Sequence, residues 1–151
     1  SCVDSARARR ELHGTLFKRG SGVSYWLDLG NTENSAQVVL GQPKAYPLPE
    51  REEWGRLPCV TELFPQLLED REEDVAPSCS VRISLQSQGL FVNDMAVRWA
   101  SQLLYELFQG PIKQHGVLVN LSSKRAGPID VNPAVWRRFG LKRRKPRGLV
   151  V

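Results

Sequence analysis

Cys2-Val3-Asp4-Ser5-Ala6-Arg7-Ala8-Arg9, residues 2–9, is the stretch that decides the fold of this chain. Two apolar residues lead into an acidic residue and then into a helical pattern, which predicts a buried strand that runs straight into a helix. In doubly wound α/β folds, ligands bind beyond the carboxyl ends of the strands, and a carboxylate there suits Mg²⁺-nucleotide chemistry. Asp4 is therefore the first candidate site residue. The chain begins with Ser1 and its only methionine is Met95, so we expect a fragment or a processed piece.

The length and composition predict one soluble globular domain. The chain has 151 residues, of which 41% are hydrophobic and 25% charged. It contains neither an apolar run of about 18 residues nor a basic segment followed by an apolar one, so we expect no membrane span and no signal peptide, and the cytoplasm as its location. Its three cysteines are widely spaced, which favours neither a disulfide framework nor a zinc site, and we expect no zinc.

The net charge of +5 is concentrated near the C-terminus. After Asp130 the charged residues are all basic, and residues 50–74 are rich in acids, which disfavours broad contact with phosphate backbones. We therefore separate a basic tail, residues 132–151, from a domain over residues 1–131. A solvated terminus is the expected state of this tail, and nucleic-acid contact is the alternative. Its basic residues are Arg137, Arg138, Lys142, Arg143, Arg144, Lys145 and Arg147.

Hydrophobic periodicity predicts the elements of the domain. A connection of about five residues lets the first two strands pair antiparallel, and the prolines within residues 42–56 exclude regular structure there. The strongest helical signal, over residues 90–109, has two adjacent apolar rows and an opposite polar face. The predicted helices span 5–17, 60–69, 90–109 and 133–139, and the predicted strands 24–29, 36–41, 116–121 and 128–131.

The order of these parts resembles the second half of ThiF/MoeB-type adenylyltransferases, the relatives of ubiquitin-activating enzymes. Four features carry the resemblance: Asp4 with Arg9 five residues later, a strand that ends in Leu29-Gly30-Asn31, a strand with Gln37-Val38, and Pro77-Ser78-Cys79 before a long helix. The amino-acid sequence of residues 25–31 and 90–93 is most similar to that of ThiF proteins of plasmid-borne PRTRC gene clusters. The resemblance implies a partial Rossmann-like mixed sheet with flanking helices, whose N-terminal nucleotide-binding half is missing.

The resemblance also implies an activity. Family members adenylate the C-terminal carboxylate of a ubiquitin-like or sulfur-carrier protein, and the residues matching Asp4 and Arg9 serve the Mg²⁺-ATP site, with Asp4 as metal ligand. The alternative for Asp4 is a helix N-cap, and the alternative for Arg9 is a solvated arginine. ATP and Mg²⁺ are the implied cofactors of the complete enzyme, and a homodimer is consistent with the family.

Cys59 is the candidate nucleophile among the three thiols. It follows Pro58 at the start of a predicted helix, where the helix dipole lowers a thiol pKa, and some relatives form a thioester with a cysteine after the crossing loop. The alternative is an unreactive, partly buried thiol. Cys79, at the family's cysteine ahead of the long helix, is expected to be structural, and His13 and His115 have no neighbour at metal-ligand spacing.

Several features depart from the family pattern. Ser5 stands where relatives have Asn, Ala36 replaces a Gly, and Gly20-Ser21-Gly22 is a loop without the third glycine or the preceding strand of a phosphate-binding motif. The leading hypothesis is the C-terminal portion of an adenylyltransferase that is inactive alone. One alternative is a small α/β module that binds a protein partner and contacts nucleic acid through its tail, and another is a remnant without activity.

Overall fold

The computed structural model describes residues 1–3, 5–18, 20–43, 56–69 and 91–141. Four strands form one sheet in the order β1-β2-β3-β4, and every pairing between them is antiparallel. The strands are β1 (Trp26–Asn31), β2 (Ser35–Gly41), β3 (Gln114–Asn120) and β4 (Arg125–Asp130). The α/β class is confirmed, but the sheet of these strands is antiparallel rather than mixed, because short turns join β1 to β2 and β3 to β4 as hairpins.

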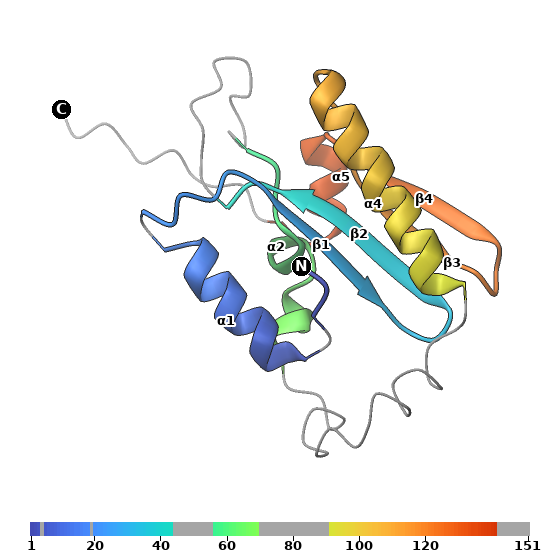
Figure 1. Cartoon of the computed structure of the whole chain (residues 1–151), viewed down its shortest axis with the longest axis horizontal. Helices are drawn as coiled ribbons and strands as arrows, with labels where there is room; N and C mark the ends of the chain where they lie inside the picture. The colour runs from blue at the N-terminus through green and yellow to red at the C-terminus, as the bar shows by residue number, and fades with distance from the viewer. Residues whose placement is uncertain (4, 19, 44–55, 70–90, 142–151) are drawn as a thin grey trace.

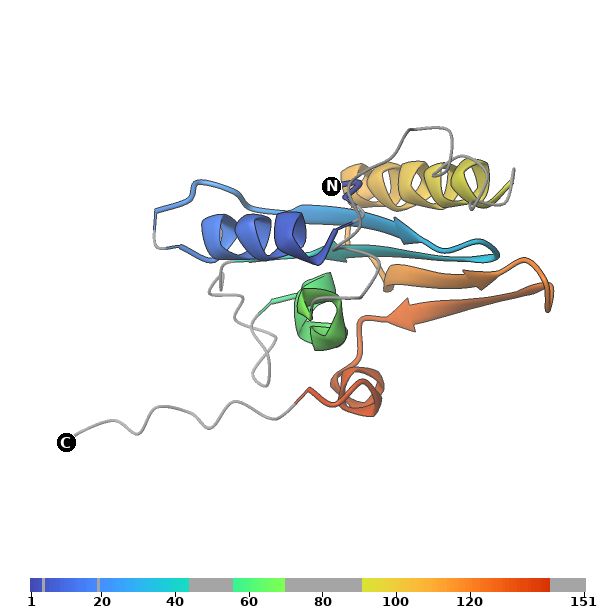
Figure 2. The same ribbon diagram turned by 90° about the horizontal axis from the view of Figure 1, so that it is seen from below.

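Helices cover both faces of this sheet (Figures 1 and 2). The long helix α4 (Val92–Gln109) lies on one face, and α2 (Val60–Leu63) and α5 (Pro133–Arg138) lie on the other. The first helix, α1 (Ala6–Leu16), lies beside β1 and contacts the 3₁₀ helix η1 (Pro65–Leu68). Among the described residues no helix is both long and apolar enough to cross a membrane.

The core has two parts because apolar side chains alternate along the strands. On one face, Ala36 and Val38 of β2 pack against the inner side of α4. The larger cluster lies mainly on the other face and gathers residues from β1, β2, β4, α2 and α5, although its member Leu40 is on the Val38 side of β2. Its most buried members, each at most 5% exposed, are Trp26, Val39, Leu40, Leu57, Cys59, Val60, Leu63, Ile129 and Trp136.

Two predicted helices differ in detail from the observed ones. The helix expected over residues 60–69 is split at Pro65 into α2 and η1, because proline cannot donate the backbone hydrogen bond that a helix interior needs. In α4 only four side chains are buried, those of Val92, Ala96, Ala100 and Leu103. Phe91, Leu104 and Phe108 of the predicted apolar rows are 68%, 37% and 82% exposed. The sheet therefore covers a narrower arc of α4 than its apolar pattern suggests.

Candidate functional site

The candidate site is a polar cluster where the N-terminal segment meets β1. The side chain of Arg9 extends from the first turns of α1, and its Nη2 lies 3.4 Å from Oδ2 of Asp28. The Asp28 side chain is fully buried and that of Arg9 is 5% exposed. A charged residue on the buried side of a strand requires a partner of opposite charge. Asp28 therefore fixes the position of the guanidinium.

Ser1 and Trp26 complete the surroundings of Asp28. The Ser1 hydroxyl donates to Oδ1 of Asp28, and the indole Nε1 of Trp26 donates to Ser1 Oγ at 2.8 Å. Both oxygens of the carboxylate thus accept from side chains, Oδ1 from Ser1 and Oδ2 from Arg9. These hydrogen bonds compensate the negative charge of Asp28, because the apolar residues around the carboxylate cannot form hydrogen bonds with it.

Arg9 also holds the backbone next to Asp4. Its Nη2 donates to the carbonyl oxygen of Val3 at 2.9 Å, whereas its buried Nε has no hydrogen-bond partner among the described residues. Asp4 itself lies outside the described residues. The helix N-cap is Ser5, whose Oγ accepts from the N–H of Ala8 at 3.1 Å, so the alternative of Asp4 as cap is wrong. Arg9 is buried rather than solvated, which corrects the second alternative.

Gly30 and Gln37 lie next to this cluster. They are paired across β1 and β2, and a Cβ on Gly30 would lie 2.5 Å from Nε2 of Gln37 and 3.4 Å from Nη2 of Arg9. A side chain at position 30 would therefore displace the amide of Gln37. The fold therefore brings Arg9 of α1 next to Gly30 and Gln37, which face each other in the hairpin of β1 and β2.

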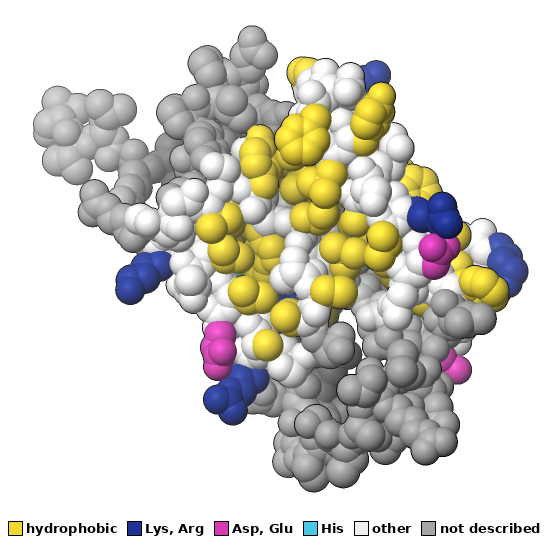
Figure 3. Space-filling model, viewed as in Figure 1, with side chains coloured by type: hydrophobic (Ala, Val, Ile, Leu, Met, Phe, Trp, Pro, Cys, Tyr) yellow, Lys and Arg dark blue, Asp and Glu magenta, His cyan; other side chains and the backbone are white. Residues whose placement is uncertain are grey.

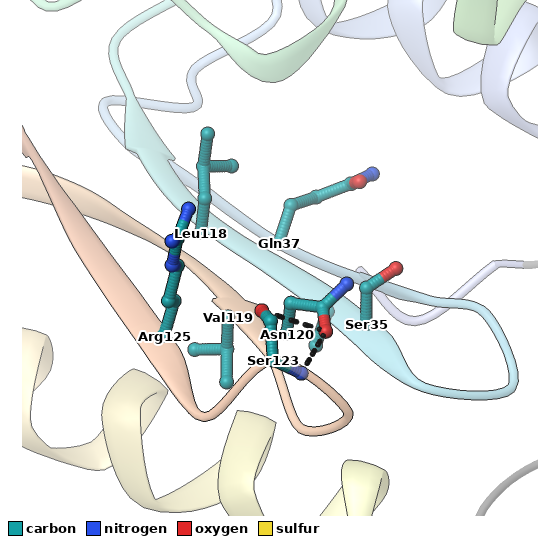
Figure 4. A pocket seen from close by; sticks show the side chains of 8 residues that line it. Ser35, Gln37, Leu118, Val119, Asn120, Ser123 and Arg125 are labelled. Carbon is teal, nitrogen blue, oxygen red and sulfur yellow. Dashed lines mark hydrogen bonds between the residues drawn. The ribbon is translucent and has the colours of Figure 1, made fainter.

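Beyond Gln37 the sheet carries both polar and apolar side chains (Figure 4). A shallow hollow there is lined by residues of β2, β3, β4 and the turn between β3 and β4. Gln37, Leu118 and Arg125 point to the side of the sheet away from α4, whereas Val119 points to the α4 side. In the turn, Asn120 Oδ1 accepts from the backbone N–H of Ser123 at 2.9 Å. Because Gln37 lines this hollow, the hollow lies next to the Gln37 end of the cluster.

Cys59 is buried on the same face of the sheet as this cluster, against Gly41 at the end of β2. It is fully buried at the start of α2, which is a helix of 4 residues. Burial raises the pKa of the Cys59 thiol well above its usual range, the charge of Glu62 raises it further, and Arg56 opposes both effects. The expected lowering by the helix dipole is therefore wrong, because burial exceeds the effect of so short a helix. Whether Cys59 accepts an activated protein stays a prediction.

Arg56 and Glu62 anchor the loop around Cys59. The guanidinium pairs with both carboxylate oxygens, with Nη1 at 2.6 Å from Oε2, and Oε2 also accepts from the N–H of Cys59 at 2.9 Å. Burial lowers the pKa of Arg56, but the hydrogen bond and charge of Glu62 outweigh it and the net change is a raised pKa. This bidentate pair was missed in the sequence, although both residues flank Cys59 closely.

His115 is a core residue. It is fully buried, and its Nδ1 donates to the carbonyl of Leu40 at 2.9 Å while Nε2 accepts from the indole N–H of Trp136 at 2.8 Å. These two contacts define a neutral imidazole with the proton on Nδ1. Among the described residues no three His, Cys, Asp or Glu side chains are grouped to hold a metal ion.

Asp28 is the site residue that sequence reasoning missed. The signal was present, because an acidic residue two positions after Trp26 falls on the buried side of an otherwise apolar strand. Cys79 and residues 142–147 of the basic tail lie outside the described residues, while Arg137 and Arg138 belong to α5.

No family model, no curated protein and no solved structure matches this chain.

Proposed function

We propose that this chain is the C-terminal part of an ATP-dependent adenylyltransferase, which activates the C-terminal carboxylate of a ubiquitin-like or sulfur-carrier protein. The observation that carries the proposal is the convergence of the separate family-like motifs around one guanidinium. Arg9 contacts Val3, the residue before Asp4, and Asp28 of the Tyr25–Asn31 motif. Its Nη2 also lies near Gly30, which is packed on Gln37 of the next strand.

In this proposal Asp4 would hold the Mg²⁺ that accompanies ATP. A carboxylate oxygen is a ligand that Mg²⁺ prefers, and attack on the α-phosphorus depends mainly on positioning and charge neutralisation. When bound, Mg²⁺-ATP supplies the electrophilic phosphorus and the pyrophosphate leaving group. The contribution of this chain is to fix the carboxylate where the N-terminal segment turns into α1.

Arg9 is a positioning residue in this site. Because its side chain is 5% exposed and faces the carboxylate of Asp28, its charge is already compensated within the protein. Its hydrogen bond to the Val3 carbonyl fixes the backbone one residue before Asp4. Arg9 therefore orients Asp4, and Asp28 in turn orients Arg9.

Cys59 belongs to a later and separable step in this proposal. Formation of the adenylate joins a carboxylate to phosphorus and needs no thiol, so the buried, protonated state of Cys59 does not prevent it. A thioester at Cys59 requires local opening around α2 that exposes the sulfur. The cytoplasmic location and the homodimer stay predictions.

The test is ATP–pyrophosphate exchange by the polypeptide that includes the nucleotide-binding half, with Mg²⁺-ATP, labelled pyrophosphate and a candidate ubiquitin-like protein. We expect Asp4→Ala and Asp4→Asn to lose exchange without a change in melting temperature, because a metal ligand needs the negative charge. Arg7→Ala is the matched control, since Arg7 is exposed on α1 and pairs only with Glu11 among the contacts of its side chain given by the structure. Full exchange by Asp4→Asn would remove Asp4 from the metal site.

Arg9→Lys tests the positioning role separately. Lysine keeps the charge but cannot bridge Val3 and Asp28 with one planar group. We expect a reduced exchange rate with an unchanged KM for ATP, and partial rescue relative to Arg9→Ala. A raised KM with an unchanged rate would instead indicate direct contact with the nucleotide and contradict the positioning role.

A further inference from the structure

The short helix α5 has one buried side chain. It follows β4 and lies on the face of the sheet away from α4 (Figure 2). Of its six residues, all of which the structure describes, only Trp136 is buried. A helix of this length has little stability of its own, so its position depends on tertiary contacts, above all those of Trp136.

The indole of Trp136 contacts His115, a fully buried residue of β3. Nε1 of the indole donates to Nε2 of the imidazole at 2.8 Å, and the two rings meet edge to face. The other imidazole nitrogen, Nδ1, donates to the carbonyl oxygen of Leu40 at 2.9 Å. A carbonyl oxygen only accepts and an indole N–H only donates, so both hydrogen bonds form only with the neutral imidazole.

Protonation of His115 reverses the contact with α5. The added proton on Nε2 points at the indole N–H, so two donors face each other and the hydrogen bond is lost. The imidazole also gains a positive charge at a fully buried position, which is unfavourable without solvation. Both effects favour a state in which water reaches the ring, and movement of Trp136 away from His115 opens that path.

The charged and titratable groups on the elements around His115 are paired, neutral or basic. β2 contains no charged residue. Asp130 of β4 accepts from Gln114 at 3.2 Å, and Glu62 of α2 pairs with Arg56. Cys59, whose pKa burial raises, is a neutral thiol at acidic pH. The remaining charged side chains of β4 and α5, and the one just before β3, are basic and oppose a further positive charge nearby: Lys113, Arg125, Arg137 and Arg138.

We propose that His115 and Trp136 form a pH-sensitive switch, which holds α5 on the sheet while the imidazole is neutral and releases α5 when the imidazole is protonated. The sheet stays intact, because backbone groups pair β3 with β2 and β4. Release carries the exposed Arg137 and Arg138 away from β4. The switch rests on the contacts of two rings and is independent of the proposed reaction.

The direction of the pH dependence follows from proton binding. An imidazole in water takes up a proton near about pH 6.5, so below that pH the released state binds more protons than the docked state. Release is therefore favoured as the pH falls from about 7 to about 5, and the docked state is favoured as the pH rises. A switch that depended on a carboxylate would respond lower, near about pH 4.

Amide hydrogen exchange across α5 measures the release. The N–H of Trp136 donates to the carbonyl of Asn132 at 3.1 Å, and this bond is lost when the helix leaves the sheet and unfolds. The readout has to be local, because the α4 face already presents apolar side chains (Figure 3), where an apolar dye binds at any pH. Relative to the unfolded chain at each pH, we expect protection of α5 to fall by about tenfold from about pH 7 to about pH 5, while the pair Val38 and Val117 stays protected.

His115→Gln tests whether the imidazole proton is responsible. The glutamine amide oxygen can accept from the indole N–H, and the amide does not titrate in this range. We expect α5 of this variant to stay protected at both pH values. His13→Gln replaces the other of the two histidines in the chain and is the matched control, which should release α5 as the unmodified chain does. Asp130→Asn should also leave the pH of release unchanged.

Trp136→Phe is a second test that leaves the histidine in place. Phenylalanine has no N–H, so a protonated His115 meets no opposing donor, and we expect a smaller pH dependence of α5 protection than in the unmodified chain. Release of α5 at an unchanged pH in His115→Gln would overturn the proposal. So would loss of protection in β2 and β3 at the same pH as in α5, because the whole sheet would then respond.

Discussion

Gly41 and Cys59 are in direct backbone contact: a Cβ placed on Gly41 would lie 2.4 Å from Cα of Cys59 and 2.6 Å from its sulfur. Since the nearest atom is backbone rather than a flexible side chain, the end of β2 and the start of α2 would have to separate. We expect Gly41→Ala to destabilise the protein by about 1–3 kcal/mol, the usual cost of overpacking. Gly127→Ala is the control, because nothing lies within 4 Å of its added Cβ. Urea unfolding of both variants measures the difference, and equal midpoints would contradict it.

Cys59 should respond to pH through its raised pKa. Burial raises the folded-state pKa of this thiol above its pKa in the unfolded chain, which is about 8.5. Between these two values the unfolded chain releases a proton that the folded protein keeps, so the free energy of unfolding falls as the pH rises. We expect a loss of stability from pH 7 to pH 10 that is smaller in Cys59→Ala. If both proteins lose the same amount, another group causes the decline.

The same burial predicts the order of thiol labelling. Cys2 is exposed and Cys59 buried, so iodoacetamide in excess should modify Cys2 first in the native protein. Cys59 should be modified at the rate at which α2 opens. Its modification should become fast only in urea, which unfolds the protein. Peptide mass mapping over time distinguishes the two sites. Early modification of Cys59 at neutral pH would show that its surroundings open readily.

Breaking the Arg9–Asp28 pair should be costly, because either partner alone leaves a buried charge uncompensated. We expect Asp28→Ala and Arg9→Ala each to cost about 3–5 kcal/mol. Arg7→Ala removes an ion pair on the same helix whose side chains are 83% and 71% exposed, and should cost less than about 0.5 kcal/mol. Thermal melts of the three variants give the comparison. A small loss in Asp28→Ala would mean that water enters the cluster and solvates Arg9.

Trp136 and His115 should be energetically coupled. The indole N–H donates to Nε2 of the fully buried imidazole, whose other nitrogen donates to Leu40. Trp136→Phe removes this donor and should cost about 1–3 kcal/mol beyond the lost packing. A double-mutant cycle with His115→Phe should yield a coupling energy of about 1 kcal/mol. Additive losses would show that the hydrogen bond contributes little.

The 151-residue chain alone should bind Mg²⁺-ATP weakly. Gly20-Ser21-Gly22 is the only glycine-rich turn near the first helix, and it lacks the strand and third glycine that a phosphate loop requires. We expect calorimetry to give no binding in the low micromolar range, about −8 kcal/mol. Binding of that strength would place a nucleotide site within these residues.

The sequence was sufficient for the local elements. The hairpin of β1 and β2 follows from two apolar segments with a short connection, and α4 follows from its long apolar period. The pairing of β2 with β3 was beyond prediction because it joins distant segments, for example Val39 with Gly116. Periodicity also could not tell which flank of α4 is covered, since Leu103 and Leu104 both belong to its apolar rows, yet Leu103 is 3% exposed and Leu104 37%.

The candidate site was predicted in part. Arg9 was identified through the resemblance, which implies an arginine five residues after Asp4, but its partner Asp28 depends on how α1 packs beside β1. The pKa shift of Cys59 was predicted in the wrong direction. The sequence shows that a helix starts there, but it does not show the close contact with Gly41 that helps to bury the thiol. Electrostatic effects depend on burial, and burial is a property of the assembled fold.

The connection of the two hairpins determines how this protein folds. β1 with β2, and β3 with β4, each close across a short turn and can form early, within microseconds. The central pairing of β2 with β3 has to wait until the intervening chain, including α2 and α4, has folded back, so the entropy of closing that large loop opposes it. Docking of one hairpin onto the other is therefore the expected rate-limiting step, and the unpaired edges of β2 and β3 are the surfaces most open to misassembly until it is complete.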